Sequence, residues 1–150
     1  MISTSFSLEI LNKSSANTLS EVLGIEYTEI NSDFLKARMP VNNSTCQQLG
    51  MLHGGASAAL CETVGSMAAY LSIDRNEFYC VGLEMKINHI KPMLGGYVYA
   101  TATVLHYGIK THVWQIRNED EKGNLVSFAT LTLAILSLDQ RVRDSINSKF

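Results

Sequence analysis

The chain has 150 residues, 46% of them hydrophobic and only 17% Asp, Glu, Lys or Arg, so we expect one folded domain over 1–150 and exclude a disordered chain. Twelve Lys and Arg against fourteen Asp and Glu leave a net charge of −2, which provides no general field for binding nucleic acid or a membrane surface. Three cysteines without zinc-site spacing, and a start without a signal-peptide pattern, indicate a reducing, cytoplasmic location.

Short helices are expected near the N-terminus, because residues 7–23 place apolar side chains at roughly helical spacing among Ser and Asn. Most of the remaining chain has the period-two alternation of half-buried strands, and it is clearest over residues 97–107. We predict an antiparallel meander of strands joined mainly by short turns, followed by a polar, solvated tail over 139–150. The six β-rich stretches lie at about 25–30, 33–40, 79–90, 97–107, 111–118 and 124–137.

One segment, residues 51–73, interrupts this alternation, because it is rich in Ala and contains Glu62 as its only charged residue. It predicts a long helix that begins near His53, is apolar nearly all round and is therefore buried on most sides. Its Ser, Gly and Glu residues disfavour a membrane span. A sheet that curls around a central helix, which is an α+β fold, satisfies both observations.

Glu62 is the first candidate functional residue. A carboxylate in a buried helix is costly unless it is paired, hydrogen-bonded or protonated, and no Lys or Arg lies within one helical turn. Such carboxylates gather at active sites, although a buried structural acceptor is the alternative. Ser66 lies one turn further on the same face, where it could bond the carboxylate or position a water, or simply be a small core residue.

The start of the helix is the second candidate, because His53, Gly54 and Gly55 place unpaired backbone N–H groups at the positive end of the helix dipole. Such groups suit a developing oxyanion, although a Gly pair before a helix is more often a turn. His53 could be a general base, an oxyanion donor or a capping residue. Gly54 and Glu62 are eight residues apart, about 12 Å along a helix, so one carbonyl group cannot touch both. If both act on one substrate, the site lies between two subunits.

Two other chemistries are less well supported. Cys61 beside Glu62 raises the possibility of a Cys–His nucleophile, but adjacent helix residues diverge by about 100° and free cysteines are usually packing groups. The four histidines show neither HxxxH nor HxH spacing and no clustered carboxylates, so no metal site is expected.

Residues 79–112 carry a local charge of +2, from Lys86, Lys91 and Lys110 against Glu84. The loops KPMLGG and YGIKT combine Lys with Gly and could cradle the phosphates of a nucleotide group. Ordinary surface lysines at turns are the alternative.

Gln47, LGMLHGGASAALCETVGSMAAYL, VGLEMKINHI, HVWQI and DEKGNL together resemble the hotdog-fold acyl-CoA thioesterases, over about residues 20–137. The resemblance is closest to the 1,4-dihydroxy-2-naphthoyl-CoA hydrolase group of menaquinone biosynthesis, with the Arthrobacter-type 4-hydroxybenzoyl-CoA thioesterases as near relatives. It implies an antiparallel sheet wrapped around a long helix, and hydrolysis of an aromatic acyl-CoA without metal or prosthetic group. It also implies a cytoplasmic homotetramer built from dimers that share their active sites.

In this family the acid at Glu62 is the nucleophile or the general base, and the hydroxyl at Ser66 helps to place the water. The N–H at Gly54 polarises the thioester carbonyl, which Gln47 and His53 help to orient from the same subunit, whereas Glu62 and Ser66 come from its partner. The positions implied to bind CoA are Val81, Gly82, His89, Ile90, Lys91, Pro92, His106, Tyr107, Gly108, Ile109, Lys110 and Thr111.

The sequence departs from the family in the last of these segments. Ile109 replaces an expected hydroxyl residue and Lys110 stands where Arg is common, so phosphate contacts there are expected to be weaker or differently arranged. Pocket shape, not these motifs, determines the acyl group. A broad-specificity thioesterase for phenylacetyl- or medium-chain acyl-CoA and a non-catalytic acyl-CoA-binding module therefore remain as alternatives.

Overall fold

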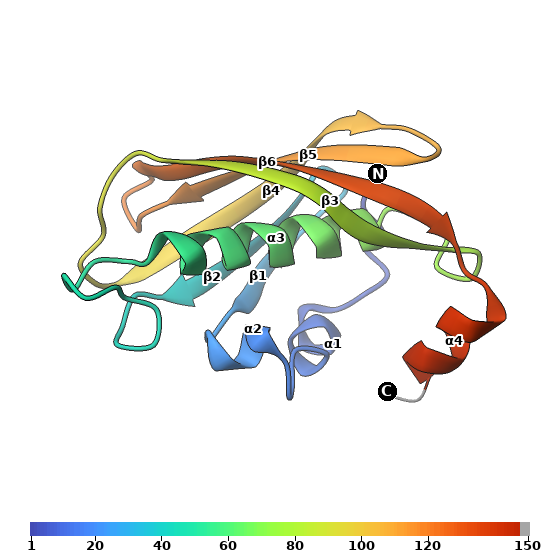
Figure 1. The fold of residues 1–150 in the computed structure, drawn as a ribbon, viewed down its shortest axis with the longest axis horizontal. Coiled ribbons are helices and arrows are strands. Elements are labelled where there is room, and N and C mark those ends of the chain that lie inside the picture. Colours follow the sequence, from blue (N-terminus) through green and yellow to red (C-terminus); the bar gives the residue numbers. More distant parts are fainter. Residues whose placement is uncertain (148–150) are drawn as a thin grey trace.

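The computed structural model describes residues 1–147 and consists of one curved sheet packed on a long helix (Figure 1). The helices are α1 (Leu8–Lys13), α2 (Leu19–Val22), α3 (Gly54–Tyr70) and α4 (Gln140–Asn147). The strands are β1 (Glu26–Ile30), β2 (Phe34–Pro40), β3 (Phe78–His89), β4 (Tyr97–Tyr107), β5 (Thr111–Glu119) and β6 (Leu125–Ser137). The α+β hotdog prediction is confirmed, with the central helix, the short N-terminal helices and all six strands in the predicted places.

The strand order is β1-β2-β4-β5-β6-β3, with every neighbouring pair antiparallel, so the prediction of a simple meander is wrong at β3. After β2 the chain runs through α3 to the far edge of the sheet, where β3 pairs with β6. Period-two alternation identifies a strand but does not name its neighbour. The long strand β3 is therefore an edge strand. It pairs with β6 on one side, and no strand within residues 1–147 pairs with its other side.

Helix α3 has two unlike faces. The face toward the sheet is buried, and small residues allow close packing there: Ala100 and Ala102 of β4 are fully buried, and Gly65 of α3 lies against Leu131 and Ile116. The opposite face is half-buried, so the expectation of a helix buried on most sides does not hold for a single chain. The sheet covers only one side of α3, and the apolar composition of the segment does not indicate which sides of the helix are covered. The half-buried face includes Ala58, Ala59, Glu62, Thr63, Ser66, Met67 and Tyr70.

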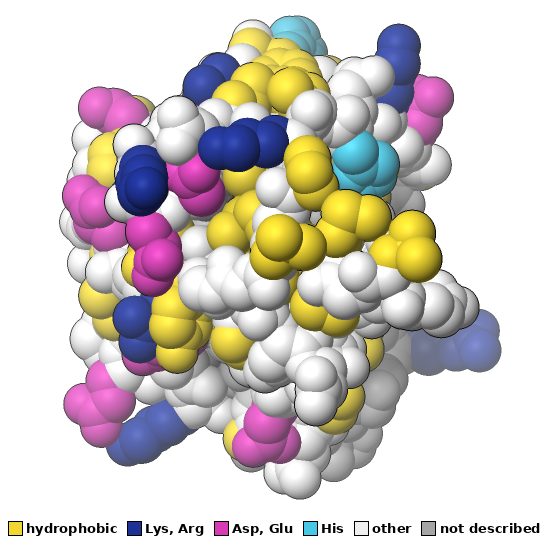
Figure 2. Space-filling model, turned by 90° about the vertical axis from the view of Figure 1, so that its left-hand side faces the viewer, with side chains coloured by type: hydrophobic (Ala, Val, Ile, Leu, Met, Phe, Trp, Pro, Cys, Tyr) yellow, Lys and Arg dark blue, Asp and Glu magenta, His cyan; other side chains and the backbone are white. Residues whose placement is uncertain are grey.

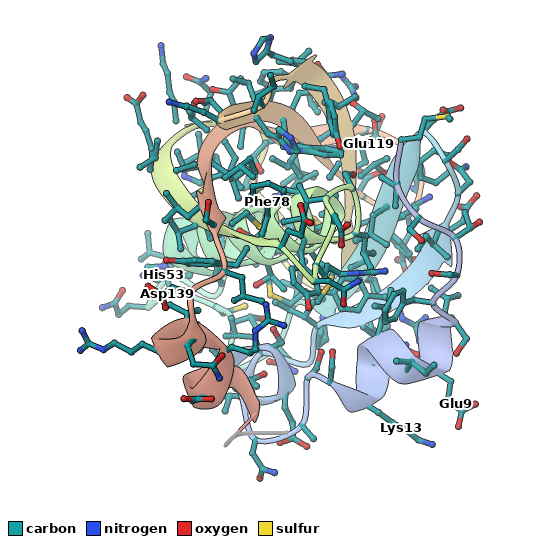
Figure 3. The ribbon with its side chains drawn as sticks, turned by 90° about the vertical axis from the view of Figure 1, so that its right-hand side faces the viewer. Glu9, Lys13, His53, Phe78, Glu119 and Asp139 are labelled. Atoms are coloured by element: carbon teal, nitrogen blue, oxygen red, sulfur yellow. The ribbon has the colours of Figure 1, made fainter. Side chains whose placement is uncertain are left out.

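The short N-terminal helices lie on the side of α3 that the sheet leaves open (Figure 1). The side chain of Asn12 fixes α1 to β1, because it accepts from the Tyr27 N–H at 2.7 Å and donates to the Tyr27 carbonyl at 3.0 Å. Figure 3 shows the Glu9 and Lys13 side chains of α1 at the outside of the molecule, where they form an ion pair of 2.7 Å. This segment therefore covers part of α3 and leaves its own polar face to solvent.

The C-terminal region differs from the predicted tail, because residues 140–147 form α4. Asp139 accepts a hydrogen bond from the Val142 N–H at 2.9 Å, and Arg143 donates to the Asn76 carbonyl at 2.8 Å. A helix held by capping and polar contacts lacks the apolar periodicity by which a sequence reveals one. Residues 148–150 of the predicted tail lie outside the described residues. Neither α4 nor any other helix within residues 1–147 combines the length and apolar character needed to cross a bilayer.

Candidate active site

The first group of predicted residues meets at the start of α3, around a cavity of about 370 Å³. Gln47 and Gly54 line this cavity together with His89, Ile90, Lys91 and Pro92, which were predicted to bind CoA. The remaining lining residues are Met51, Leu52, Ser57 and Val126. Figure 2 shows hydrophobic side chains gathered on this end of the molecule, with Lys, Arg and His side chains among and around them.

The cavity combines a free backbone donor with an oriented amide. Gly54 is the first residue of α3, and its N–H donates to no group within residues 1–147. The Oε1 atom of Gln47 accepts from the Leu49 N–H, which leaves the Gln47 NH₂ group free to donate. Two donors beside an open cavity can hold a carbonyl oxygen as negative charge develops on it.

His53 caps α3, as one of the alternatives from sequence proposed. Its Nδ1 atom accepts from the Gly55 N–H at 2.8 Å, so the proton of the neutral ring lies on Nε2. The ring packs so tightly that a Cβ atom on Gly55 would lie 2.9 Å from Nδ1. This arrangement favours His53 as an N–H donor, because Nδ1 is already occupied and Nε2 carries the proton.

The second group lies near the middle of α3, where Ser66 Oγ donates to Glu62 Oε1 at 3.1 Å. Glu62 lies on the half-buried face, so this carboxylate is not enclosed in the core as the apolar helix had indicated. Gly82 of β3 lies directly against it, and a Cβ atom at that position would overlap Glu62 Oε1. The resemblance assigned Gly82 to CoA binding, and no sequence pattern linked it to the carboxylate.

The two groups remain apart within one chain. Eight residues separate Gly54 from Glu62 along a straight helix, a distance of about 12 Å, and Glu62 does not line the first cavity. A second cavity of about 330 Å³ begins at Ser66 and runs toward the N-terminal helices. Each chain therefore presents two half-sites, one with hydrogen-bond donors and one with a carboxylate.

The predicted CoA-binding residues are also divided. The β4–β5 turn is closed by the Gly108 N–H, which donates to the Thr111 carbonyl at 3.0 Å. Near this turn Tyr107, Gly108 and Ile109 line a small cavity of about 180 Å³ that Ile135 also lines. Val126 of the first cavity precedes Ile135 by nine residues of β6, or about 30 Å. Lys110 lies in the same turn, which His106 near the end of β4 and Thr111 at the start of β5 flank, and Val81 lies beside Gly82 on β3.

The cationic part of the first cavity is partly neutralised. Lys91 Nζ lies 3.2 Å from Asp120 Oδ2, so its charge is shared with that carboxylate. Hydrogen bonds from Asn124, together with Lys91, hold the pKa of Asp120 well below its usual range. A phosphate bound by Lys91 would therefore compete with an ion pair.

The structure argues against a cysteine nucleophile. Burial raises the pKa of Cys61 to about 12, even though Asn118 Nδ2 donates to its sulfur at 3.2 Å. Burial also raises the pKa of Cys80 to about 11. Thiols with such pKa values are protonated near neutral pH and are poor nucleophiles. Among residues 1–147, no three His, Cys, Asp or Glu side chains are grouped so that they could hold a metal ion.

Comparison with known proteins gives consistent matches. A family model described as Thioesterase superfamily matches residues 49–127. The 1,4-dihydroxy-2-naphthoyl-CoA hydrolase of Escherichia coli (strain K12) is 43% identical over 129 residues, which are 86% of this chain and 94% of that protein. The proofreading thioesterase EntH of Cronobacter turicensis is 44% identical over 129 residues, 86% of this chain and 93% of that protein.

The fold is matched equally well. The crystal structure of a mutant of the thioesterase PA1618 from Pseudomonas aeruginosa superimposes with a TM-score of 0.89 at 42% identity, covering 91% of this chain and 99% of that one. The segment that matches the family model contains His53, Gly54, Glu62 and Ser66. Both half-sites therefore have residues within the part of the chain that is shared with these proteins.

Proposed function

This chain belongs to the thioesterase superfamily and is a thioester hydrolase, and from this premise we propose that its substrate is an aromatic acyl-CoA. We propose 1,4-dihydroxy-2-naphthoyl-CoA of menaquinone biosynthesis as the first candidate. The 43% identity to the Escherichia coli hydrolase of that thioester supports this choice. The observation that carries the chemistry is the placement of a free Gly54 N–H and the Glu62–Ser66 pair on one helix.

The proposed site is completed by a second copy of the chain. The edge strand β3 is 12 residues long, and its Leu83 and Val81 side chains are 62% and 40% exposed. An edge of this length is a template for pairing. Antiparallel pairing of β3 with its copy would run the two α3 helices in opposite directions and bring Glu62 of one toward Gly54 of the other. A homotetramer made of two such dimers, acting in the cytoplasm, completes the proposal.

In this scheme the thioester oxygen accepts hydrogen bonds from the Gly54 N–H and from the Gln47 NH₂ or His53 Nε2–H. These donors stabilise the negative charge that the oxygen gains as the carbonyl carbon is attacked. On one route Glu62 takes a proton from water, the new C–O bond forms, the C–S bond breaks, and the proton passes to the departing CoA thiolate. On the other route Glu62 itself forms the C–O bond and the C–S bond breaks, which releases the CoA thiolate and leaves a mixed anhydride on Glu62. Water then hydrolyses this anhydride, which regenerates Glu62, releases the carboxylic acid and supplies the proton that the thiolate takes up.

Ser66 serves both routes in the same way, because its hydroxyl donates to the Glu62 carboxylate at 3.1 Å. Every step uses groups of the two chains and water, so the proposal contains no cofactor. The predicted CoA-binding residues at the first cavity, His89 to Pro92, and those at the β4–β5 turn lie at opposite ends of the sheet in one chain. They would hold one CoA only if different subunits contribute them.

A second candidate is a thioesterase of broader specificity, such as one for phenylacetyl- or medium-chain acyl-CoA. The 44% identity to a protein named proofreading thioesterase EntH supports it, because this relative, which has a different name, is as similar to the chain as the naphthoyl-CoA hydrolase is. Both candidates use the same residues and differ only in the acyl pocket.

The test is to measure thiol release from 1,4-dihydroxy-2-naphthoyl-, benzoyl-, phenylacetyl- and hexanoyl-CoA by the wild-type protein and by Glu62→Gln. We expect the highest kcat/KM for the naphthoyl thioester and loss of all four activities in Glu62→Gln. Similar kcat/KM values for all four thioesters would favour the broader enzyme. Absence of wild-type thiol release from every thioester would overturn the proposal and favour a binding module.

A further inference from the structure

A further cavity, of about 310 Å³, lies at the end of the molecule where α3 stops and β3 begins (Figure 1). Its lining contains neither Glu62 nor Ser66 and no residue of the first cavity. Tyr70 is shared with the cavity beside Ser66, and it lies eight residues beyond Glu62, about 12 Å along α3. Four of the eight lining side chains carry aromatic rings, from Phe6, Tyr70, Phe78 and Tyr79, and two are Arg75 and Arg143.

The two arginines bring positive charge to this cavity without a countercharge. No Asp or Glu lines the cavity, and neither Arg75 nor Arg143 forms an ion pair with a carboxylate among residues 1–147. The acids next to them in the chain have other partners, because Asp74 accepts from a backbone N–H at 3.0 Å and Asp144 accepts from the Gln140 amide at 2.7 Å. An anion in the cavity would therefore meet two guanidinium groups and no repelling carboxylate.

Arg75 is held by aromatic rings and not by hydrogen-bond acceptors. Its Cζ atom lies 4.2 Å from the centroid of the Phe6 ring and 5.9 Å from the centroid of the Tyr70 ring. A guanidinium that stacks on a ring keeps the N–H groups at its edge available for donation. Its Nη1 atom is buried and has no hydrogen-bond partner within residues 1–147. A charged group with an unpaired buried donor is costly, and an anion bound to the same guanidinium offsets this cost.

Arg143 reaches the cavity from a different element. It lies on α4, and its Nη2 atom donates to the Asn76 carbonyl at 2.8 Å, which joins α4 to the segment that carries Arg75. This bond uses one of the five N–H donors of the guanidinium. Two guanidinium groups on separate elements can therefore bind both oxygens of one carboxylate.

The walls of the cavity favour one kind of anion. The four aromatic rings and Leu138 surround the two guanidinium groups with mostly apolar surface. A small inorganic anion would give up its hydration without using these walls. A molecule with an aromatic ring and a carboxylate can place the ring against the aromatic side chains and the carboxylate against the guanidinium groups.

We propose that this cavity binds an aromatic carboxylate at a site separate from the proposed active site, with Arg75 as the main anion-binding residue and Arg143 as the second. The inference does not depend on the proposed function, because binding of such a ligand requires no hydrolysis. The acid that is released from an aromatic acyl-CoA belongs to the same class of ligand.

Isothermal titration calorimetry with the full chain tests this site by measuring Kd for benzoate and 1-naphthoate. Benzamide keeps the ring without the charge, cyclohexanecarboxylate keeps the carboxylate without the aromatic ring, and inorganic phosphate has neither ring nor carboxylate. The variants are Arg75→Gln and Arg143→Gln. Arg117→Gln is the matched control, because Arg117 is an exposed arginine of β5 that pairs with Glu119 and does not line this cavity. Thermal unfolding shows whether each variant is folded.

We expect the aromatic carboxylates to bind about tenfold or more tightly than benzamide and phosphate, and about threefold or more tightly than cyclohexanecarboxylate. Arg75→Gln should raise their Kd by about tenfold or more, Arg143→Gln should raise it by a smaller factor, and Arg117→Gln should leave it unchanged. No binding to the wild type, or an unchanged Kd in Arg75→Gln, would overturn the site. Phosphate that binds as tightly as benzoate would overturn its assignment to aromatic carboxylates. If Arg75→Gln fails to fold, an unchanged Kd in Arg143→Gln overturns the site instead.

Glu62→Gln separates this site from the proposed active site. Because Glu62 does not line the cavity, we expect this variant to bind benzoate as the wild type does. A changed Kd in Glu62→Gln would place the ligand beside that carboxylate and overturn the proposal. The calorimetry involves no thioester, so failure of this site and failure of the proposed hydrolysis are observed in different experiments.

Discussion

The beginning and the middle of α3 offer opposite kinds of chemistry. At its beginning the useful group is a backbone N–H at Gly54, which exists because every helix leaves its first donors unpaired. At its middle the useful groups are the Glu62 and Ser66 side chains, which exist only because of the residue types at those positions. A rigid helix holds the two about 12 Å apart. On the proposed mechanism one chain therefore carries two incomplete sites, and a second chain is needed to complete either of them.

The largest expected effect is at the middle of the helix. Glu62→Gln keeps the size and the hydrogen-bonding capacity of the side chain but removes the charge that both routes require. We expect kcat/KM to fall by about 10²- to 10⁴-fold, with unchanged thermal unfolding. Glu29→Gln is the matched control, because Glu29 is an exposed residue of β1, at the edge of the sheet opposite to β3. Near-normal turnover in Glu62→Gln would remove the carboxylate from the mechanism.

The second-largest expected effect is at the beginning of α3. Among substitutions at Gly54, only proline removes the backbone N–H of that residue. Gly54→Pro is compatible with the first position of a helix, and His53 before it is already extended, with φ −70° and ψ 133°. Loss of one oxyanion donor should lower kcat by about 10²- to 10³-fold. Gly54→Ala is the control, because its Cβ also meets His89 Nε2 at 3.0 Å but its N–H remains. Equal losses in both variants would show that crowding, not the donor, matters.

A smaller effect tests how the carboxylate is placed. In Gly82→Ala the new Cβ overlaps Glu62 Oε1, so the carboxylate must move although no reacting group has been removed. We expect kcat to fall by about tenfold or more with little change in KM. Gly95→Ala, where the added Cβ meets nothing within 4 Å, should behave as the wild type. Unchanged kcat in Gly82→Ala would mean that the space beside Glu62 is not critical.

The smallest expected effect concerns His112, at the end of the sheet away from the first cavity. It changes the stability of the fold and not the catalytic rate. Burial lowers the pKa of His112 below its usual 6.5, so the unfolded chain binds this proton at a higher pH than the folded one. The free energy of unfolding should therefore fall as pH drops below about 6.5, by up to about 1.4 kcal/mol per pH unit until the folded pKa is reached. Urea unfolding at several pH values should show this decrease in the wild type. His112→Phe should reduce it strongly. The exposed His106→Phe should reduce it far less, because the charge of His106 lowers the His112 pKa less than burial does. An undiminished slope in His112→Phe would assign the effect to other groups.

The sequence was informative where a residue differs in chemical type from its neighbours along the chain. Glu62 is conspicuous as the only charge in a long apolar segment, and His53-Gly54-Gly55 marks a helix start, so both could be predicted as candidate residues, and the helix does begin at Gly54. The edge position of β3 could not, because alternation carries no information about neighbours.

Some features were not predicted from the sequence, because they depend on contacts between residues that are distant along the chain. Gly82 lies against a carboxylate that is twenty residues earlier in the chain, and Tyr27 shares a cavity with residues from four other elements or connections. Such juxtapositions arise only when the chain folds. Helix α4 was missed because its eight residues include too few apolar ones for a helical period to be recognised in the sequence.

The central claim is that a complete site takes its donors from one subunit and its carboxylate from another. It is tested most directly by co-expressing Glu62→Gln with Gly54→Pro and measuring thioester hydrolysis by the mixed protein. Each variant alone has no complete site, but a mixed dimer has one wild-type Gly54 facing one wild-type Glu62. With random mixing we predict recovery of about a quarter of wild-type activity per chain. A mixture as inactive as the separate variants would contradict a shared site.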